Sequence, residues 1–178
     1  ELAQRDAQNE ALLPNPAVRK AMLAPGLSNA DIISIVLEGY AERPPLGERD
    51  YEIARDAATS GMARRYLPAF HTITYRELRA HAEALASAWR HHDRHRVERD
   101  AFVCIIGFSG IDFAVVDIAA SFAQVATVPL QTSMTRAQLE DILRSTEAST
   151  LVSTIADLAQ AVSMAIATGG IRSIITID

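Results

Sequence analysis

The segment Gly107-Phe-Ser-Gly110 combines residue types that could bind a phosphate or carry a nucleophilic serine. It joins an apolar run to a helical pattern, which is where glycine-rich phosphate loops occur. A dinucleotide-binding fingerprint has a third glycine, and a Walker loop has Gly-Lys-Ser or Gly-Lys-Thr; the segment has neither. We expect a tight turn in which Ser109 caps the following helix, and phosphate binding is the alternative.

Ser109 also partly matches the nucleophile of a hydrolase. Ile111, however, stands where the second glycine of a nucleophile elbow is required. In hydrolases of that fold the general-base histidine follows the serine in the sequence. Here every histidine precedes it: His71, His81, His91, His92 and His95. The sequence therefore predicts no complete Ser-His-acid triad within this chain.

His91, His92 and His95 form the densest group of metal-ligating residue types. On a continuous helix His91 and His95 would lie one turn apart and could share a metal ion. The acid among them is Asp93, and no cysteine accompanies them. Three arginines surround the group and would repel a cation: Arg90, Arg94 and Arg96. We expect a solvated helix end whose positive charge matches the negative end of the helix dipole.

The single cysteine, Cys104, has no partner for an internal disulfide. It lies inside the apolar run Phe102-Val-Cys-Ile-Ile106, which is typical of a buried strand. We expect Cys104 to pack in the core rather than to act as a reactive thiol.

The composition is that of a globular chain with an acidic balance. Its 178 residues suffice for one domain that buries roughly 70% of its unfolded surface. A net charge of −5 argues against a nucleic-acid partner. No apolar run approaches the roughly 20 residues of a membrane span, and the first residues lack the apolar stretch of a signal peptide. A cytoplasmic location is the expectation.

Four segments carry a helix-start pattern, in which Ser or Thr is followed three residues later by Asp, Glu or Gln. In such a capping box the hydroxyl accepts a hydrogen bond from the first turn, and the second side chain reaches back to the cap. The four pairs are Thr74 and Glu77, Ser109 and Asp112, Thr135 and Gln138, and Thr154 and Asp157.

Strand candidates begin near Phe102, Ala126, Thr150 and Ser173, at intervals of 24, 24 and 23 residues. Regular units of strand and helix favour right-handed crossovers and a parallel sheet with helices on its faces. The predicted fold class is therefore α/β: a doubly wound, mostly parallel sheet of flavodoxin-like or Rossmann-like type. In such sheets ligands bind just past the carboxyl ends of the strands.

Three regions precede or make up this predicted sheet. Residues 1–43 read as a helical leader, with one helix over Ala17–Leu23 and a second capped by Ser28 or Asn29. Residues 44–75 read as an extended hairpin that follows Pro44-Pro45. Residues 76–178 read as the subdomain of repeated strand and helix units, and its first helix runs from Thr74 to Trp89.

Several stretches of sequence resemble known enzymes. The stretches Ile73–Leu78, Phe102–Ile106 and Val125–Leu130 resemble the amino-terminal part of acyl-adenylating enzymes, the superfamily of acyl-CoA synthetases and peptide-synthetase adenylation domains. Within it, the chain is similar to carboxylic acid reductases. That likeness rests on Asn15-Pro-Ala-Val18, Glu38–Pro44, Leu67–Leu78 and Val128-Pro-Leu-Gln-Thr-Ser133. Where relatives have a glycine before the Val-Pro-Leu strand, this chain has Gln124.

The resemblance implies an amino-terminal fragment of a multidomain enzyme. Such enzymes use ATP and Mg²⁺ to activate a carboxylic acid as acyl-AMP, transfer the acyl group to a phosphopantetheine thiol and reduce the thioester to an aldehyde with NADPH. The implied partners are the remainder of the adenylation domain, the carrier and reductase domains, and the acid substrate. The family's catalytic, cofactor-binding and metal-binding residues would all follow Asp178. None is assigned to this chain, and the fragment alone is expected to be inactive.

Two short segments bear on the implied adenylation site. Thr59-Ser60-Gly61 matches the first letters of the family's phosphate loop, but Met62-Ala-Arg-Arg follows instead of a second glycine and a lysine, so a hairpin turn is expected. Gln131, Thr132 and Ser133 follow a strand end and could line an acyl pocket; the alternative is helix entry with hydrogen bonding to the sheet edge.

Two other interpretations stay open at this stage. An acyl-CoA ligase would use the same adenylation chemistry without the reductase half. A stand-alone flavodoxin-like binding module would use the open sheet edge and apolar surface for a partner.

Overall fold

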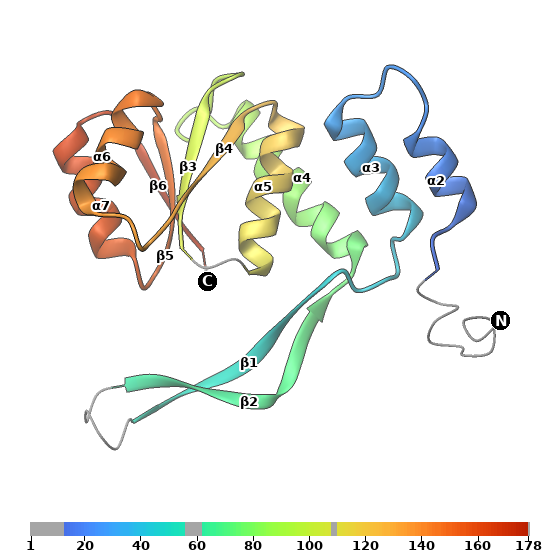
Figure 1. Cartoon of the computed structure of the whole chain (residues 1–178), viewed down its shortest axis with the longest axis horizontal. Helices are drawn as coiled ribbons and strands as arrows, with labels where there is room; N and C mark the ends of the chain where they lie inside the picture. Colours follow the sequence, from blue (N-terminus) through green and yellow to red (C-terminus); the bar gives the residue numbers. More distant parts are fainter. Residues whose placement is uncertain (1–12, 56–61, 108–109, 178) are drawn as a thin grey trace.

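The described part of the chain begins with two helices, each with a side-chain cap at its N-terminus. The computed structural model describes residues 13–55, 62–107 and 110–177 (Figure 1). Helix α2 spans Pro16–Met22, and helix α3 spans Asn29–Gly39. The hydroxyl of Ser28 accepts a hydrogen bond from the Asp31 N–H at 3.2 Å, while the Asp31 carboxylate accepts one from the Ser28 N–H at 2.9 Å. Of the two residues that the sequence offered as the cap of α3, Ser28 is therefore the cap.

A long hairpin follows the leader helices. Strands β1 (Leu46–Arg55) and β2 (Met62–Ile73) pair antiparallel, with a bulge between Arg49 and Tyr51. Figure 1 shows the hairpin projecting away from the helices and from the parallel sheet. The predicted turn at Thr59-Ser60-Gly61 lies outside the described residues. Strand β2 ends at Ile73 because Thr74 begins the cap of the next helix.

A four-stranded parallel sheet forms the main body. Its strands are β3 (Phe102–Ile106), β4 (Ala126–Leu130), β5 (Thr150–Thr154) and β6 (Ser173–Ile177). They begin at the four predicted positions and lie in the order β4-β3-β5-β6. The direction of the connections reverses between β3 and β5, which makes this the topological switch point. The predicted doubly wound α/β fold class is confirmed.

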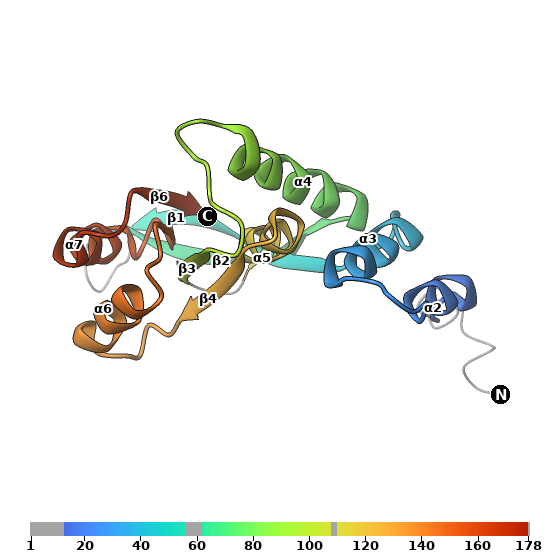
Figure 2. The same cartoon turned by 90° about the horizontal axis from the view of Figure 1, so that it is seen from above.

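Helices cover both faces of this sheet, as Figure 2 shows. Helices α4 (Tyr75–His91) and α5 (Ile111–Ala123) pack on one face around the buried Trp89, Val103 and Val116. Helices α6 (Arg136–Ser145) and α7 (Leu158–Thr168) pack on the other around Leu139, Leu151 and Met164. The near-continuous apolar runs of β3 and β5 follow from burial on both sides.

A third apolar cluster joins the leader and hairpin to the body. It contains Leu37 of α3, Ile73 at the end of β2, and Ile111 and Val115 of α5. Leu46, at the start of β1, packs against it. This end of the hairpin is thus seated on the α4 and α5 side of the sheet.

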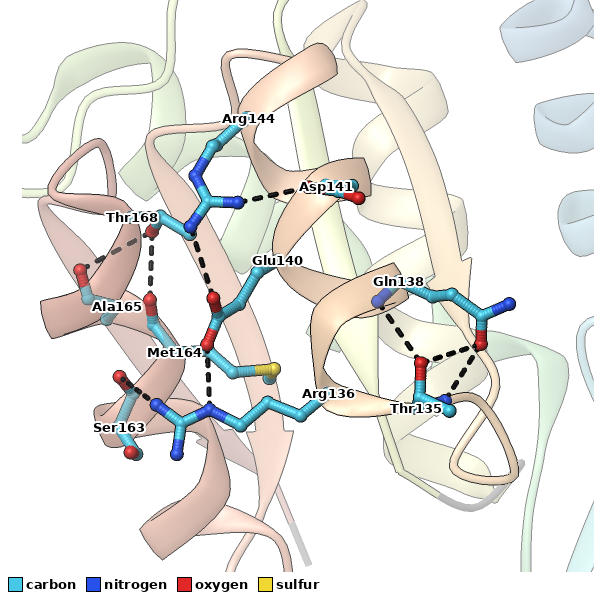
Figure 3. Close-up of polar contacts among 10 residues, drawn as sticks. All are labelled: Thr135, Arg136, Gln138, Glu140, Asp141, Arg144, Ser163, Met164, Ala165 and Thr168. Atoms are coloured by element: carbon cyan, nitrogen blue, oxygen red, sulfur yellow. Dashed lines mark hydrogen bonds and ion pairs between the residues drawn. The ribbon is translucent and has the colours of Figure 1, made fainter.

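Two of the four predicted capping boxes have the expected geometry. At α4 the Thr74 hydroxyl accepts from the Glu77 N–H at 3.2 Å, and the Glu77 carboxylate accepts from the Thr74 N–H at 2.7 Å. At α6 the corresponding pair is Thr135 and Gln138, drawn in Figure 3. The same view shows Glu140 between two arginines: its Oε1 lies 2.7 Å from Arg136 Nε, and its Oε2 lies 3.1 Å from Arg144 Nη2.

The predicted helix start at Thr154 is three residues too early, because the cap position of α7 is Asp157. The Asp157 N–H does donate to the Thr154 hydroxyl at 3.3 Å, as expected for the predicted pair. Thr154 is the last residue of β5, paired with Ile177 of β6, and the three residues after it form a turn. The Thr154 hydroxyl donates to the Asp157 carboxylate at 2.7 Å, so the pair stabilises this turn. Helix α7 begins at Leu158, because the chain must first turn away from the strand direction.

No helix of the described ranges combines the length and the apolar character needed to cross a membrane.

Candidate functional site

A cavity of about 630 Å³ lies where the base of the hairpin meets the carboxyl edge of the parallel sheet. The start of α5 forms one wall, and Thr154 and Ile177 contribute the ends of β5 and β6. Residues Leu46 to Arg49 with Tyr51 and Tyr66 supply the hairpin side. This is the edge of the sheet at which α/β folds bind their ligands, so it is the candidate site.

At the switch point of the sheet, the end of β3 lies very close to the end of β5. Gly107 has a φ of +149°, a conformation that favours glycine. A Cβ at Gly107 would also collide with the Thr154 side chain, so β3 and β5 approach closely here. Phe108 and Ser109 lie outside the described residues. The expected Ser109 cap is therefore not tested; helix α5 begins at Ile111, and its cap position is Gly110.

The positive end of α5 receives a carboxylate from a distant part of the chain. The Glu48 Oε1 atom accepts a hydrogen bond from the Ile111 N–H, although the two residues are 63 positions apart. A Cβ at Gly110 would meet the same oxygen. A negative charge is stabilised at a helix N-terminus by the unpaired N–H groups and the dipole. The N–H of Ile111 thus faces a carboxylate of this chain, and the phosphate-binding alternative gains no support from the described geometry.

The aromatic and cationic groups of the cavity are held within the hairpin. The Arg49 Nε donates to the Leu67 carbonyl at 2.9 Å, and its guanidinium carbon lies 5.8 Å from the Tyr66 ring centre. The rings of Tyr51 and Tyr66 meet edge to face, with centroids 6.3 Å apart. These contacts shape the walls of the cavity. Its described lining contains no Ser, Cys or Thr hydrogen-bonded to a histidine, the pair that a Ser-His hydrolase uses.

Cys104 lies in the core, as predicted. Its side chain is fully buried in β3, and its Sγ lies 3.7 Å from the Thr146 hydroxyl. Burial raises the pKa of the Cys104 thiol, so less of the reactive thiolate is present at neutral pH. The residue is a packing element and takes no part in the cavity.

The histidine group is not arranged as a helical metal site. Helix α4 ends at His91, and the C-cap residue His92 has extended backbone angles. His91 and His95 therefore do not lie on successive turns of one helix, which corrects the spacing assumed above. The His92 and His95 ring centres lie 4.6 Å apart with the rings tilted by 31°, and His92 Nδ1 accepts from the Arg94 N–H at 3.3 Å. Across the part of the chain that the structure describes, no group of three or more His, Cys, Asp or Glu could hold a metal ion.

Gln131, Thr132 and Ser133 form an exposed turn after the edge strand β4. The Met134 N–H donates to the Gln131 carbonyl at 3.0 Å, and the capped helix α6 follows. None of the three lines the cavity described above. Their role in an acyl pocket remains a prediction.

Glu48 is the residue that sequence reasoning missed. It lies in a run of three exposed residues of β1, and nothing near it in the sequence indicates a contact with a helix 63 positions later. No signal in the sequence indicated this contact, because Ser109 was the expected cap of that helix. The structure shows Gly110 at the cap position, with no side chain to accept from the first turn.

Comparisons with known proteins agree with the fold and with the resemblance in the sequence. A carboxylic acid reductase of Mycobacterium tuberculosis is 37% identical over 162 residues, which are 91% of this chain and 14% of that protein. The solved A-PCP didomain of the carboxylic acid reductase from Segniliparus rugosus, in complex with AMP, matches 99% of this chain with a TM-score of 0.89 and 34% identity. This chain spans 25% of that structure.

The likeness to ligases is weaker and shows the fold alone. The anthranilate CoA ligase AuaEII matches 60% of this chain with a TM-score of 0.55 and 17% identity. The model of the family described as AMP-binding enzyme matches residues 53–177, from the hairpin to the last strand. This chain therefore belongs to the AMP-binding enzyme family, and it matches part of the adenylation domain of carboxylic acid reductases.

Proposed function

We propose that this chain is a scaffold portion of the adenylation domain of a carboxylic acid reductase. The observation that supports this proposal best is the extent of the structural match. It covers 99% of the chain, so the helical leader and the hairpin are included, at 34% identity. The match to a CoA ligase stops at 60% of the chain. The ligase and the stand-alone binding module are thus not favoured.

The proposed reaction of the whole protein begins with a carboxylate, which resists attack by hydride. ATP with Mg²⁺ converts it to an acyl-AMP, and a phosphopantetheine thiol on a carrier domain then takes the acyl group as a thioester. NADPH reduces the thioester to an aldehyde. We place this chemistry in the cytoplasm, and its partners are the remainder of the adenylation domain, the carrier and reductase domains, and a carboxylic acid.

The N–H of Ile111 at the start of α5 already donates to the Glu48 carboxylate, so this position offers no support for a nucleotide phosphate. Following the resemblance to carboxylic acid reductases, we propose that the catalytic and cofactor-binding groups lie in residues outside this chain. No catalytic step is assigned to its side chains.

Sequencing the coding region past residue 178 tests the proposal. The expected result is a Ser/Thr/Gly phosphate loop with a lysine, then a carrier serine motif, then a dinucleotide fingerprint. A phosphate loop without the last two would favour a ligase. A reading frame that contains no phosphate loop would contradict the proposal altogether.

A further inference from the structure

The Glu48 side chain links the hairpin to the parallel sheet domain. The side chain extends from β1 to the first turn of α5, where its carboxylate accepts a hydrogen bond from the Ile111 N–H. Because Ile111 is the first residue of α5, its N–H has no acceptor within the helix. The contact therefore satisfies a donor that the helix itself cannot satisfy.

Gly110 leaves the space that this contact needs. Its φ of −137° and ψ of −167° are extended backbone angles that any residue can adopt. The glycine is therefore not required by backbone conformation. A Cβ at this position would meet Oε1 of Glu48, so what the missing side chain provides is room for the carboxylate.

The bulge of the hairpin lies directly beside this contact. The regular register of β1 and β2 continues through Arg49, the residue after Glu48, and is interrupted between Arg49 and Tyr51. A bulge bends its strand and changes the direction of nearby side chains. Here it separates the end of the hairpin that packs on the apolar cluster, at Leu46, from the part that projects away (Figure 1).

We propose that the Glu48–Ile111 contact fixes the orientation of the hairpin relative to the carboxyl edge of the sheet, and so sets the width of the cavity between them. The carboxylate takes the position of a bound anion at the start of α5, where charge-assisted hydrogen bonds to N–H groups are strong. Without it, the hairpin pivots at the bulge while the sheet and its helices keep their structure.

Hydrogen exchange of the complete 178-residue chain tests the contact itself. In Glu48→Ala the Ile111 amide should exchange about fivefold faster, as expected when a helix loses an N-terminal cap, and in Glu48→Gln about twofold faster, because the amide accepts without charge. Glu52→Ala is the matched control: Glu52 pairs with Arg65 inside the hairpin, so the Ile111 amide should be unaffected.

Gly110→Ala provides an independent variant, since its methyl group displaces the same carboxylate. The variant carrying both Glu48→Ala and Gly110→Ala should exchange at Ile111 about as fast as either single variant, because both changes remove one interaction. Far-UV circular dichroism and Trp89 fluorescence verify the fold of each variant. If Glu48→Ala does not fold, Glu48→Gln and Gly110→Ala decide by the same criterion. Unchanged exchange at Ile111, or effects that multiply in the double variant, would overturn the proposal.

Pulsed electron spin resonance tests the orientation of the hairpin. Spin labels at Arg55→Cys, near the far end of β1, and at Arg172→Cys, before β6, should give one narrow distance distribution in the parent and in Glu52→Ala. The distribution should broaden in Glu48→Ala and in Gly110→Ala. The buried Cys104 is left in place. A distribution that stays narrow in both would show that other contacts orient the hairpin.

Discussion

Gln124 occupies a backbone position that suits glycine better than any residue with a side chain. It ends α5 in the left-handed conformation, with φ +59° and ψ +45°. The Val125 N–H donates to the Ala120 carbonyl at 3.0 Å, which is the long-range bond of a Schellman motif. Glycine is the common residue at such a position because it has no Cβ to clash. The Gln124 side chain therefore adds strain that glycine would not.

Gln124→Gly should therefore stabilise the protein. Glycine removes the steric strain of the left-handed conformation, and this gain in free energy exceeds the loss caused by the greater freedom of glycine in the unfolded chain. We expect the free energy of unfolding, measured by urea denaturation, to rise by about 1 kcal/mol. Gln160→Gly, inside α7, is the matched control and should lose about 1 kcal/mol. Destabilisation by both substitutions would show that Gln124 is not strained.

The cap at Thr74 should make stability depend on pH. Hydrogen bonds from the Thr74 N–H and hydroxyl lower the pKa of the Glu77 carboxyl below its ordinary value of 4.5. A group whose pKa is lowered by folding contributes stability above the unfolded pKa, and this contribution is lost as the pH falls through the folded pKa. Thr74→Ala removes the hydroxyl partner of this carboxylate and keeps the N–H partner. It should cost about 1 kcal/mol at pH 7 and somewhat less at a pH low enough to protonate Glu77.

Ser87→Ala, on the exposed side of the same helix, is the control for Thr74→Ala and should be neutral or slightly stabilising. An equal cost of Thr74→Ala at both pH values, measured by chemical denaturation, would show that the Glu77 charge does not act through the Thr74 hydroxyl.

At the scale of the elements, local patterns predicted the strands and failed where distant contacts decide. The four strands were predictable because a buried parallel strand is a short apolar run at a regular interval. The caps at Thr74 and Thr135 were predictable because both partners lie within one turn. The first residue of α7 could not be predicted, because hydrogen bonding between β5 and β6 keeps Thr154 in the strand. The acceptor for the Ile111 N–H could not be predicted either, because it comes from the distant strand β1.

The packing of α6 on the sheet is open to direct test. Leu139 is fully buried between α6, α7 and β5, so Leu139→Ala should lower the free energy of unfolding by about 2–5 kcal/mol through lost burial and a residual cavity. Ile166 lies on the outer side of α7 with 78% of its surface exposed, and Ile166→Ala should change stability by less than about 0.5 kcal/mol. Equal thermal shifts for the two variants would contradict this assignment of faces.

At the scale of the whole molecule, the fold could be predicted but the cavity could not. The parallel sheet with helices on both faces follows from the regular intervals and from right-handed crossovers, whereas the order of its strands is known from the structure alone. The cavity depends on how the hairpin lies against α5 and β6, and no local pattern encodes the angle between two elements so far apart in the sequence. That the catalytic groups lie outside this chain follows from the resemblance to reductases and stays a prediction.

We propose that this chain is a scaffold and that adenylation requires residues outside it. ATP–pyrophosphate exchange, measured with Mg²⁺ and a panel of aromatic and fatty acids, distinguishes this from a self-sufficient adenylation site. The folded 178-residue chain should give no exchange above the rate without protein, whereas the product of the longer coding region should give exchange that depends on the acid. Exchange by the 178-residue chain alone, dependent on both the acid and ATP, would contradict the claim.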